Sequence, residues 1–281
     1  MIHILGPGDD VLITYTLDEI RKNKAVLTNA IWIDLFQPTE EEELFVEKII
    51  GVELPDRDEM HDIAESSRLF EENNTLYLSA WLLRFDTVIP DLSSVNFVLT
   101  KKHFVSIRDS DHHALRVFIH SRNHLLEGHF ETQYCAFVQL LESIVGHIAS
   151  SLRLVEQDLN LLSVAIFAQQ KGQQPKNKVG LKSTVQHLGK LNTMVTHLRE
   201  SSVSLSTLTP FFLNFAGEEL KPHVACQLET IEKDIVSLRQ YDEDLSSEIG
   251  FLLDSTVGLI SYEQNQTMKV LSFVALFVAF I

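Results

Sequence analysis

The sequence is poor in cysteine and in positive charge. Its two cysteines, Cys135 and Cys226, lie far apart in 281 residues and outside any Cys-x-x-Cys pattern. This argues against a disulfide framework and a cysteine-type zinc site, and it favours a reducing compartment. Lys and Arg number 23 against 39 Asp and Glu, which gives a formal charge of -16 at pH 7. Because nucleic acid is held by clustered positive charge, we expect no nucleic-acid partner.

Signatures of catalysis are also missing. The sequence has no Gly-x-Ser-x-Gly, no phosphate-binding loop and no dinucleotide fingerprint. His120 and His124 are one helical turn apart, just after His112 and His113, and two imidazoles at this spacing can share a metal. Chance pairs are expected among 12 histidines, however, and no His-Glu-x-x-His is present. We therefore expect a protein that is not an enzyme.

The two ends of the sequence differ in character. The N-terminus lacks a basic region followed by an apolar run, so no secretory signal is visible and this end is expected in the cytosol. From Val270 to Ile281 the sequence is apolar apart from Ser272. A spanning helix needs roughly 20 apolar residues, so this shorter run is either a core helix or an interrupted transmembrane segment. The absence of a polar or glycine cap favours the interrupted segment.

Up to about residue 130 the sequence indicates alternating short strands and acidic helices. Strands are predicted at 32–35, 75–83, 95–100 and 103–107, where β-branched and aromatic residues gather. The clearest helix follows Pro38-Thr39, since Glu40 to Glu43 place four carboxylates at the favourable end of its dipole. A second helix is expected after Pro55 and a turn at 71–74. The pattern predicts an α/β or α+β domain.

After about residue 130 apolar residues recur every three or four positions, which predicts long helices. The first contains the stripe from Phe137 to Leu162 and ends at a polar loop, 171–178; the second runs from Leu181 to about Ser202. Pro210 and Gly217 are expected to interrupt the chain before the last helix.

That last helix is predicted to begin near Pro222 and to be unusually long. Its apolar stripe, from Val224 to Leu252, is close to a heptad and contains one polar position, Asp242. Continued to Ile281, the helix would extend on the order of 90 Å. The alternative is a helix that breaks near Gly250 or Gly258.

Two blocks of sequence resemble the CorA family of divalent-cation (magnesium and cobalt) transporters. Residues 252–271 read LLDSTVGLISYEQNQTMKVL and are similar to the approach to that family's first transmembrane helix. The second block resembles the family's amino-terminal domain and consists of WIDL at 32–35, PTEEE at 38–42, RDEM at 57–60 and ESSRLFEE at 65–72. The blocks have the family's order and separation, so the resemblance covers essentially the whole chain.

The resemblance implies an α+β protein that assembles as a homopentamer. Residues 1–130 would form a cytoplasmic α/β/α sandwich, 131–222 a helical hairpin, 223–268 a stalk helix, and 269–281 the shortened start of a transmembrane helix. The protein would lie in the cell's inner (plasma) membrane, held through its C-terminal helix, with residues 1–268 cytoplasmic.

The resemblance also implies a pore-lining strip at Asn265, Met268 and Leu271. Five asparagine amides would hydrogen-bond the water shell of Mg2+, which dehydrates reluctantly, and rings of Met and Leu would close the pore by excluding water. The alternative for Met268 and Leu271 is ordinary helix packing.

A regulatory cation site between subunits is a second implication. Carboxylates of the small domain would face carboxylates of a neighbouring stalk, and a bound cation would hold the channel closed. The candidates are Asp58, Glu59 and Asp62 on one side, and Glu229, Glu232 and Asp234 on the other. The sequence departs from the family at the stalk position that would carry an aspartate, where the nearest residue is Thr230. The alternative is a solvated acidic helix face.

The family's signature Gly-Met-Asn does not occur in the sequence. We therefore expect a shortened chain, with transport of Mg2+, Co2+, Ni2+ or Zn2+ belonging to the complete protein. Two alternatives stay open: a metal-sensing oligomerisation module without a pore, and a zinc-transporting relative.

Overall fold

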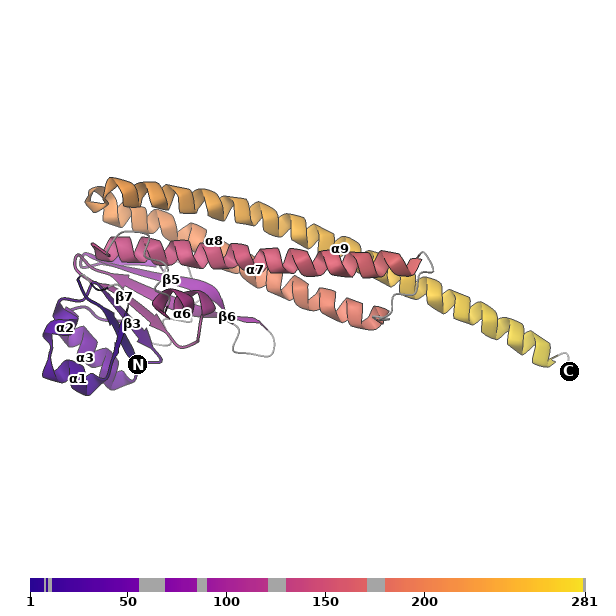
Figure 1. The fold of residues 1–281 in the computed structure, drawn as a ribbon, viewed down its shortest axis with the longest axis horizontal. Helices are drawn as coiled ribbons and strands as arrows, with labels where there is room; N and C mark the ends of the chain where they lie inside the picture. The colour runs from indigo at the N-terminus through magenta and orange to yellow at the C-terminus, as the bar shows by residue number, and fades with distance from the viewer. Residues whose placement is uncertain are drawn as a thin grey trace. The chain divides into compact units, whose positions relative to one another are not determined.

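The computed structural model describes residues 1–7, 9, 12–55, 69–84, 90–120, 130–170 and 180–279 (Figure 1). The fold is α+β, a mixed sheet followed by long helices, as the sequence predicts. The chain divides into two compact units. Met1–Ser150 with His197–Arg239 form one, here called the sheet unit, and Ser151–Thr196 with Gln240–Ile281 form the other, the helical unit.

The sheet unit contains a seven-stranded sheet with the order β2-β1-β3-β7-β6-β5-β4. Its strands are β1 (Ile2–Leu5), β2 (Ile13–Tyr15), β3 (Trp32–Phe36), β4 (Leu69–Glu72), β5 (Thr75–Arg84), β6 (Asp91–Leu99) and β7 (Phe104–Arg108). Neighbouring β3 and β7 are parallel, and the other pairs are antiparallel. The four predicted strands are confirmed. The expected turn lies between β4 and β5, where Asn73 and Asn74 both have positive φ.

One face of the sheet is covered by three short helices, α1 (Leu17–Lys22), α2 (Ala25–Thr28) and α3 (Glu40–Ile50) (Figure 1). Strand residues alternate between the two faces, so Ile33 and Leu35 of β3 join Val105 and Ile107 of β7 in the core beneath these helices. Helix α3 begins where the sequence predicts. Thr39 caps it in a reciprocal capping box with Glu42, and Gly51 ends it with φ 75°. The helix expected after Pro55 lies outside the described residues.

The opposite face carries an aromatic core. Trp32 of β3 stacks on Phe104 of β7, with ring centroids 5.3 Å apart. Phe104 meets Phe137 of α7 (Gln133–Gln170) at 5.2 Å, and Phe137 meets Phe212 of α8 (Leu181–Ala216) at 4.8 Å. Helix α6 (His113–His120) adds Phe118, which lies 5.6 Å from Trp32. Helices therefore cover both faces, as the expected α/β/α sandwich requires.

Helix α8 corrects one expectation, because it continues through Pro210 instead of ending before it. A proline inside a helix costs about 3 kcal/mol through a lost hydrogen bond and a clash. Pro210 is exposed, whereas its neighbours Leu208 and Phe212 are fully buried. Burial of these side chains offsets the cost. The helix ends instead at Ala216, and a short 3-10 turn (Gly217–Glu219) follows, in which Gly217 has φ 42°.

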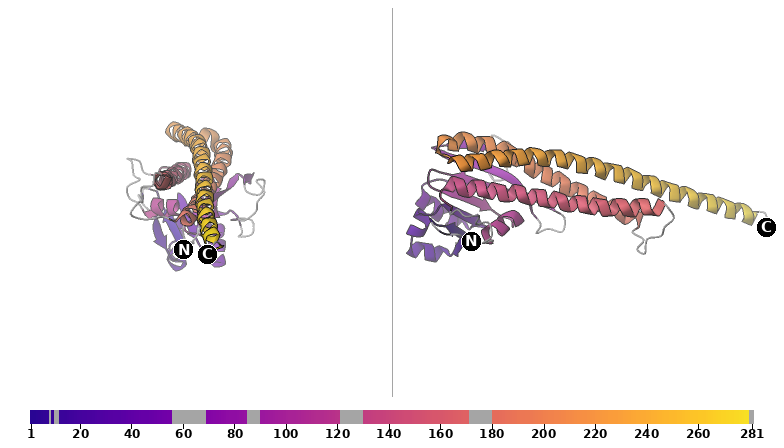
Figure 2. Two further views of the ribbon diagram at one scale, coloured as in Figure 1. Left: turned by 90° about the vertical axis from the view of Figure 1, so that its right-hand side faces the viewer. Right: turned by 45° about the horizontal axis from the view of Figure 1, so that its top comes forward.

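The last helix, α9 (Pro222–Ala279), is unbroken at Gly250 and Gly258 and has 58 residues. In the helical unit, Phe167 of α7 packs against Phe251 of α9 with ring centroids 6.1 Å apart. His187 of α8 lies 3.6 Å from Asp158 of α7, between imidazole Nε2 and carboxylate Oδ2. Figure 2 gives two further views of these helices. The prediction of one continuous terminal helix is confirmed.

Candidate functional site

The terminal part of α9 has no packing partner within the described chain. Thr256 is the last fully buried residue, and its hydroxyl donates to the Leu252 carbonyl oxygen at 2.7 Å. Every side chain from Ser261 to Ala279 is exposed; we call these residues the terminal segment. Phe273 and Phe277 are 73% and 75% exposed. A contiguous run of exposed apolar side chains marks a surface for contact with a partner, and the described residues supply none.

The three pore candidates lie in this segment. Asn265 is exposed, Met268 is 63% exposed and Leu271 is 57% exposed. At 3.6 residues per turn, each step of three residues turns by about 60° short of a full circle, so the three side chains form a slowly winding strip. The structure thus leaves all three available for contact outside the chain.

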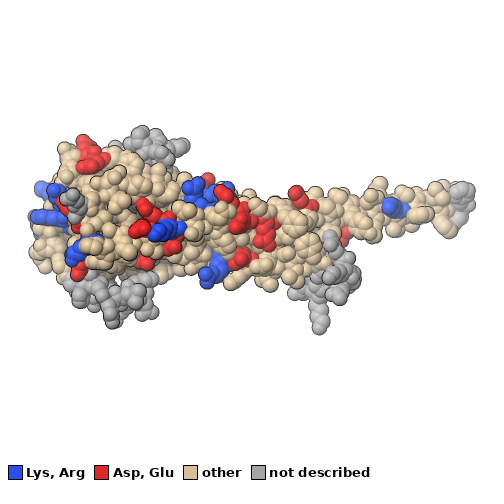
Figure 3. Space-filling model, turned by 90° about the horizontal axis from the view of Figure 1, so that it is seen from above, with Lys and Arg blue, Asp and Glu red and all other residues tan. Residues whose placement is uncertain are grey.

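Apolar character begins directly after these candidates. Lys269 is the last charged residue of α9, and the described residues 270–279 are apolar apart from Ser272. Figure 3 shows the end of the helix as almost free of charge, whereas acidic side chains gather along the middle of the long helices. Surface of this kind suits lipid or other apolar helices better than water.

Only one stretch of the described residues is long and apolar enough by composition to cross a membrane, and it is Gln133–Phe167 of α7. However, 61% of its apolar window is buried inside the structure. Because α7 supplies Phe137, Leu141 and Ile144 to the core, its apolar character is explained by packing. The end of α9 is the better candidate for membrane contact.

The stalk carboxylates lie on the exposed side of α9. Glu229 accepts a hydrogen bond from Lys233 Nζ at 2.7 Å, and this bond lowers the pKa of Glu229 below its ordinary value. Asp234 is exposed and Glu232 is half-buried. The Thr230 hydroxyl, at the position where the family would have an aspartate, donates to the Cys226 carbonyl oxygen at 3.0 Å. Asp58, Glu59 and Asp62, their expected partners, lie outside the described residues.

Within the described residues there is no group of three or more His, Cys, Asp or Glu side chains that could hold a metal ion. A regulatory site built from α9 carboxylates would therefore need ligands from outside the described residues or from another copy of the chain. This is compatible with an intersubunit site, which stays a prediction.

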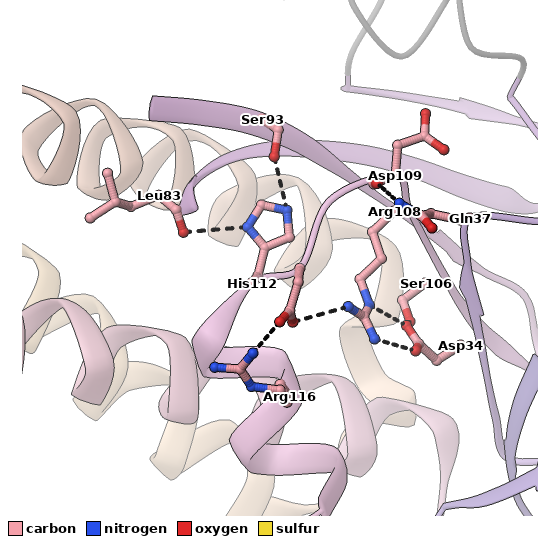
Figure 4. Close-up of polar contacts among 10 residues, drawn as sticks. Asp34, Gln37, Leu83, Ser93, Ser106, Arg108, Asp109, His112 and Arg116 are labelled. Atoms are coloured by element: carbon pink, nitrogen blue, oxygen red, sulfur yellow. Dashed lines mark hydrogen bonds and ion pairs between the residues drawn. The ribbon is translucent and has the colours of Figure 1, made fainter. Parts of the chain in front are cut away.

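A buried charge pair lies between β3 and β7 and was not predicted from the sequence (Figure 4). Arg108 donates from Nε and Nη2 to the two carboxylate oxygens of Asp34, at 3.1 and 2.9 Å, and both side chains are almost fully buried. Ser106 also donates to Asp34, at 2.7 Å, and the Arg108 guanidinium lies 4.4 Å from the centroid of the Phe36 ring. This bidentate ion pair satisfies both buried charges and links the parallel strands β3 and β7.

Only part of the predicted histidine group lies within the described residues. His112 is buried, and its ring nitrogens face Ser93 Oγ at 3.1 Å and the Leu83 carbonyl oxygen at 3.4 Å (Figure 4). His124 and the side chain of His120 lie outside the described part of the chain. His113 instead stacks on His147 of α7, a residue that the sequence interpretation did not select.

Comparison with known proteins gives a consistent family. A family model described as "CorA-like Mg2+ transporter protein" matches residues 28–279. The "Magnesium transport protein CorA" of Mannheimia succiniciproducens is 29% identical over 261 residues, which cover 92% of this chain and 79% of that protein. The protein of the same description from Escherichia coli K12 is 26% identical over 255 residues, which cover 89% of this chain and 76% of that protein.

Solved structures agree on the fold. The soluble domain of CorA from Methanocaldococcus jannaschii matches with a TM-score of 0.71 and 14% identity, covering 92% of this chain and 97% of that chain. The complete CorA magnesium transporter of that organism matches with a TM-score of 0.70 and 16% identity, covering 98% of this chain and 82% of that chain. The ZntB cytoplasmic domain from Vibrio parahaemolyticus matches with a TM-score of 0.63 and 13% identity, covering 93% of this chain and 98% of that chain. At these identities the likeness concerns the fold alone.

Proposed function

The chain belongs to the CorA family, and on this premise we propose that it is the cytoplasmic and stalk part of a transporter that carries Mg2+ across the cell's inner membrane. The observation that carries the proposal is the family match over residues 28–279, which extends into the terminal segment. The curated relatives that match most of this chain are described as magnesium transport proteins. Transport moves an ion without covalent chemistry, so no catalytic residues are required.

In the proposed mechanism five copies of α9 surround a pore, and Mg2+ is the cargo. Exposure of Asn265 on every copy would let a ring of amides hydrogen-bond the hydrated ion. Below that ring, Met268 and Leu271 would form an apolar constriction that closes by expelling water. Membrane potential would drive the cation inward, and the apolar residues from Val270 onward would contact lipid or the neighbouring helices.

Gating is proposed to depend on cytoplasmic cation. Asp58, Glu59 and Asp62 of one subunit would face Glu229, Glu232 and Asp234 of the next, with carboxylate oxygens as ligands of the kind that Mg2+ prefers. Without the ion these carboxylates would repel one another, so its loss would favour a different subunit arrangement. Residues 1–268 would lie on the cytoplasmic side.

The transport proposal is tested by Mg2+ influx into cells that express the complete natural protein, measured with a fluorescent Mg2+ indicator. Asn265→Ala should reduce influx strongly, because it removes the amide ring. Gln266→Ala is the matched control, since this neighbouring amide bonds to Tyr262 on the same helix, at 3.0 Å. Equal influx in both variants would contradict the assigned pore face. If the protein carries Zn2+ or Co2+ into the cells but does not carry Mg2+, it is a relative with a different ion preference.

The gating proposal is tested by proteolysis of the chain with and without millimolar Mg2+. Glu232→Ala combined with Asp234→Ala should abolish any Mg2+-dependent protection, whereas Glu243→Ala, an exposed acid further along α9, should leave it intact. Unchanged protection in the double variant would discard these residues as ligands. Mg2+-dependent protection together with absence of influx in the complete protein would instead indicate a metal-sensing module.

A further inference from the structure

Helices α7 and α9 lie beside each other in one constant register. Three contacts join their side chains: Gln227 with Glu142, Tyr241 with Glu156, and Phe251 with Phe167. In each pair the α9 residue comes 84 or 85 positions after its α7 partner in the sequence. The two helices are therefore parallel, and each level of α7 has a defined counterpart in α9.

Each helix has a buried stripe that advances in alternating steps of four and three residues. The stripe of α7 is entirely apolar and consists of Leu141, Val145, Ile148, Leu152, Val155, Leu159, Leu162 and Ile166. The stripe of α9 consists of Val224, Leu228, Ile231, Ile235, Leu238, Asp242, Leu245, Ile249, Leu252 and Thr256. Alternation of four and three is the heptad repeat of parallel helices that pack along their length.

A strict heptad makes the apolar packing nearly independent of register. If α9 slides by seven residues, which is about 10.5 Å along its axis, every member of its stripe from Val224 to Ile249 takes the place of another member. Apolar side chains then meet the uniformly apolar stripe of α7 as before. The contacts outside the stripes oppose a slide only weakly, since Tyr241 is half-buried and Phe251 is 60% exposed.

The connection between α8 and α9 also leaves room for a slide. Residues 217–223 precede the first stripe residue of α9, and seven extended residues can reach about 23 Å. This reach is about twice the length of a seven-residue slide, so the register must be fixed within the packed helices themselves.

Asp242 distinguishes one register from the others. Its side chain is fully buried, and in the present register its carboxylate has an electrostatic interaction within the chain. A slide would place the carboxylate where Ile235 or Ile249 is now packed, and a buried charge in surroundings that fit an isoleucine is costly. Thr256 has no such effect, because its hydroxyl donates to the Leu252 carbonyl oxygen of its own helix and moves with it.

We propose that Asp242 is a positioning residue that fixes the register of α9 against α7. A single polar residue in a heptad stripe specifies register in coiled coils, at some cost in stability. Because α9 is unbroken as far as Ala279, a slide would carry Asn265 and Leu271 the same distance along the helix axis. Asp242 thereby sets the position of the terminal segment, and this inference does not depend on the proposed transport function.

The test is a distance measurement by pulsed electron paramagnetic resonance on the chain in lipid nanodiscs. Spin labels are attached to Gln157→Cys of α7 and Ser261→Cys of α9, two exposed positions, after Cys226→Ser, and the remaining Cys135 is buried. Labelled chains are diluted with unlabelled chains, so that only distances within one chain are recorded. The chain with Asp242 should give one distance, and Asp242→Leu should add a second that differs by about 10 Å.

Asp242→Ala should add the same second distance, and it keeps the test decisive if leucine overfills the site. Asp242→Asn should retain the single distance, because an amide in the stripe also disfavours apolar surroundings. Thr256→Val is the matched control, since it replaces the other polar member of the stripe with an apolar residue, and it should retain the single distance. One unchanged distance in both Asp242→Leu and Asp242→Ala would overturn the proposal. A second distance in Thr256→Val would overturn it too, because register would then not depend on Asp242.

Discussion

The sheet unit and the terminal segment of α9 use apolar residues in opposite ways. In the sheet unit, Phe104 and Phe137 are fully buried against each other, and the Asp34–Arg108 pair is satisfied inside the protein. In the terminal segment, Phe273 and Phe277 are exposed, with no described residue covering them. The first region is stabilised by its own contacts, whereas the apolar side chains of the second are covered by no described residue. Lipid and further copies of the same helix fit the apolar character of that surface.

The largest difference between the two regions should appear on replacing one phenylalanine in each. Phe104→Ala should lower the free energy of unfolding by about 3–5 kcal/mol, because it opens a cavity among Trp32, Phe97 and Phe137. Phe273→Ala should leave unfolding unchanged and should reduce binding to lipid vesicles. Urea denaturation followed by circular dichroism measures the first quantity, and vesicle sedimentation the second. A comparable loss of stability in Phe273→Ala would show that the terminal segment packs within its own chain.

The two kinds of ion pair provide a smaller contrast. Asp34→Ala should cost about 3 kcal/mol, near the lower end for a broken buried pair, because Asp111 still lies 3.9 Å from Arg108. Glu229→Ala removes the exposed pair with Lys233 on α9 and should change stability by less than about 1 kcal/mol. Thermal unfolding at two salt concentrations compares them. A similar effect from both substitutions would refute the distinction between buried and exposed pairs.

A smaller effect than loss of the buried pair is a pH dependence that originates at His147. Burial lowers its pKa in the folded chain to about 4, from an ordinary value of 6.5. Between these values the unfolded chain binds the proton more readily, so stability should fall as the pH is lowered from about 6.5 to about 4. After allowance for partial solvent screening the loss is about 1–2 kcal/mol. His147→Asn should flatten the profile in this range when unfolding is followed with a chelator present, and an unaltered slope would exclude His147 as its source.

The sequence was informative where the signal is local. The Thr39 cap, the acidic first turn and Gly51 define α3 within a few neighbouring residues, and the heptad-like stripe from Val224 to Leu252 defines the first half of α9. Strands β1 and β2 were missed because four and three residues are too few to establish an alternating pattern. Pro210 was taken as a break because its local cost is visible in the sequence, whereas the compensating burial of Phe212 is not.

The candidate sites show the same limit. Asp34 and Arg108 are 74 residues apart, and only the parallel pairing of β3 with β7 brings them together. His113 and His147 likewise meet only because α6 packs against α7. By contrast, Asn265, Met268 and Leu271 were selected through a family resemblance, and they lie on the continuous terminal helix that the sequence predicts; their role in a pore stays a prediction. Local motifs were therefore predictable, whereas side-chain pairs distant in sequence required the fold.

The central claim, that the terminal segment is completed by lipid and by other copies of the chain, is tested most directly by the mass of the protein in lipid nanodiscs with and without millimolar Mg2+. We expect five copies per disc with Mg2+ present, and a less stable assembly when Mg2+ is removed with a chelator. A single copy per disc under both conditions would contradict this account.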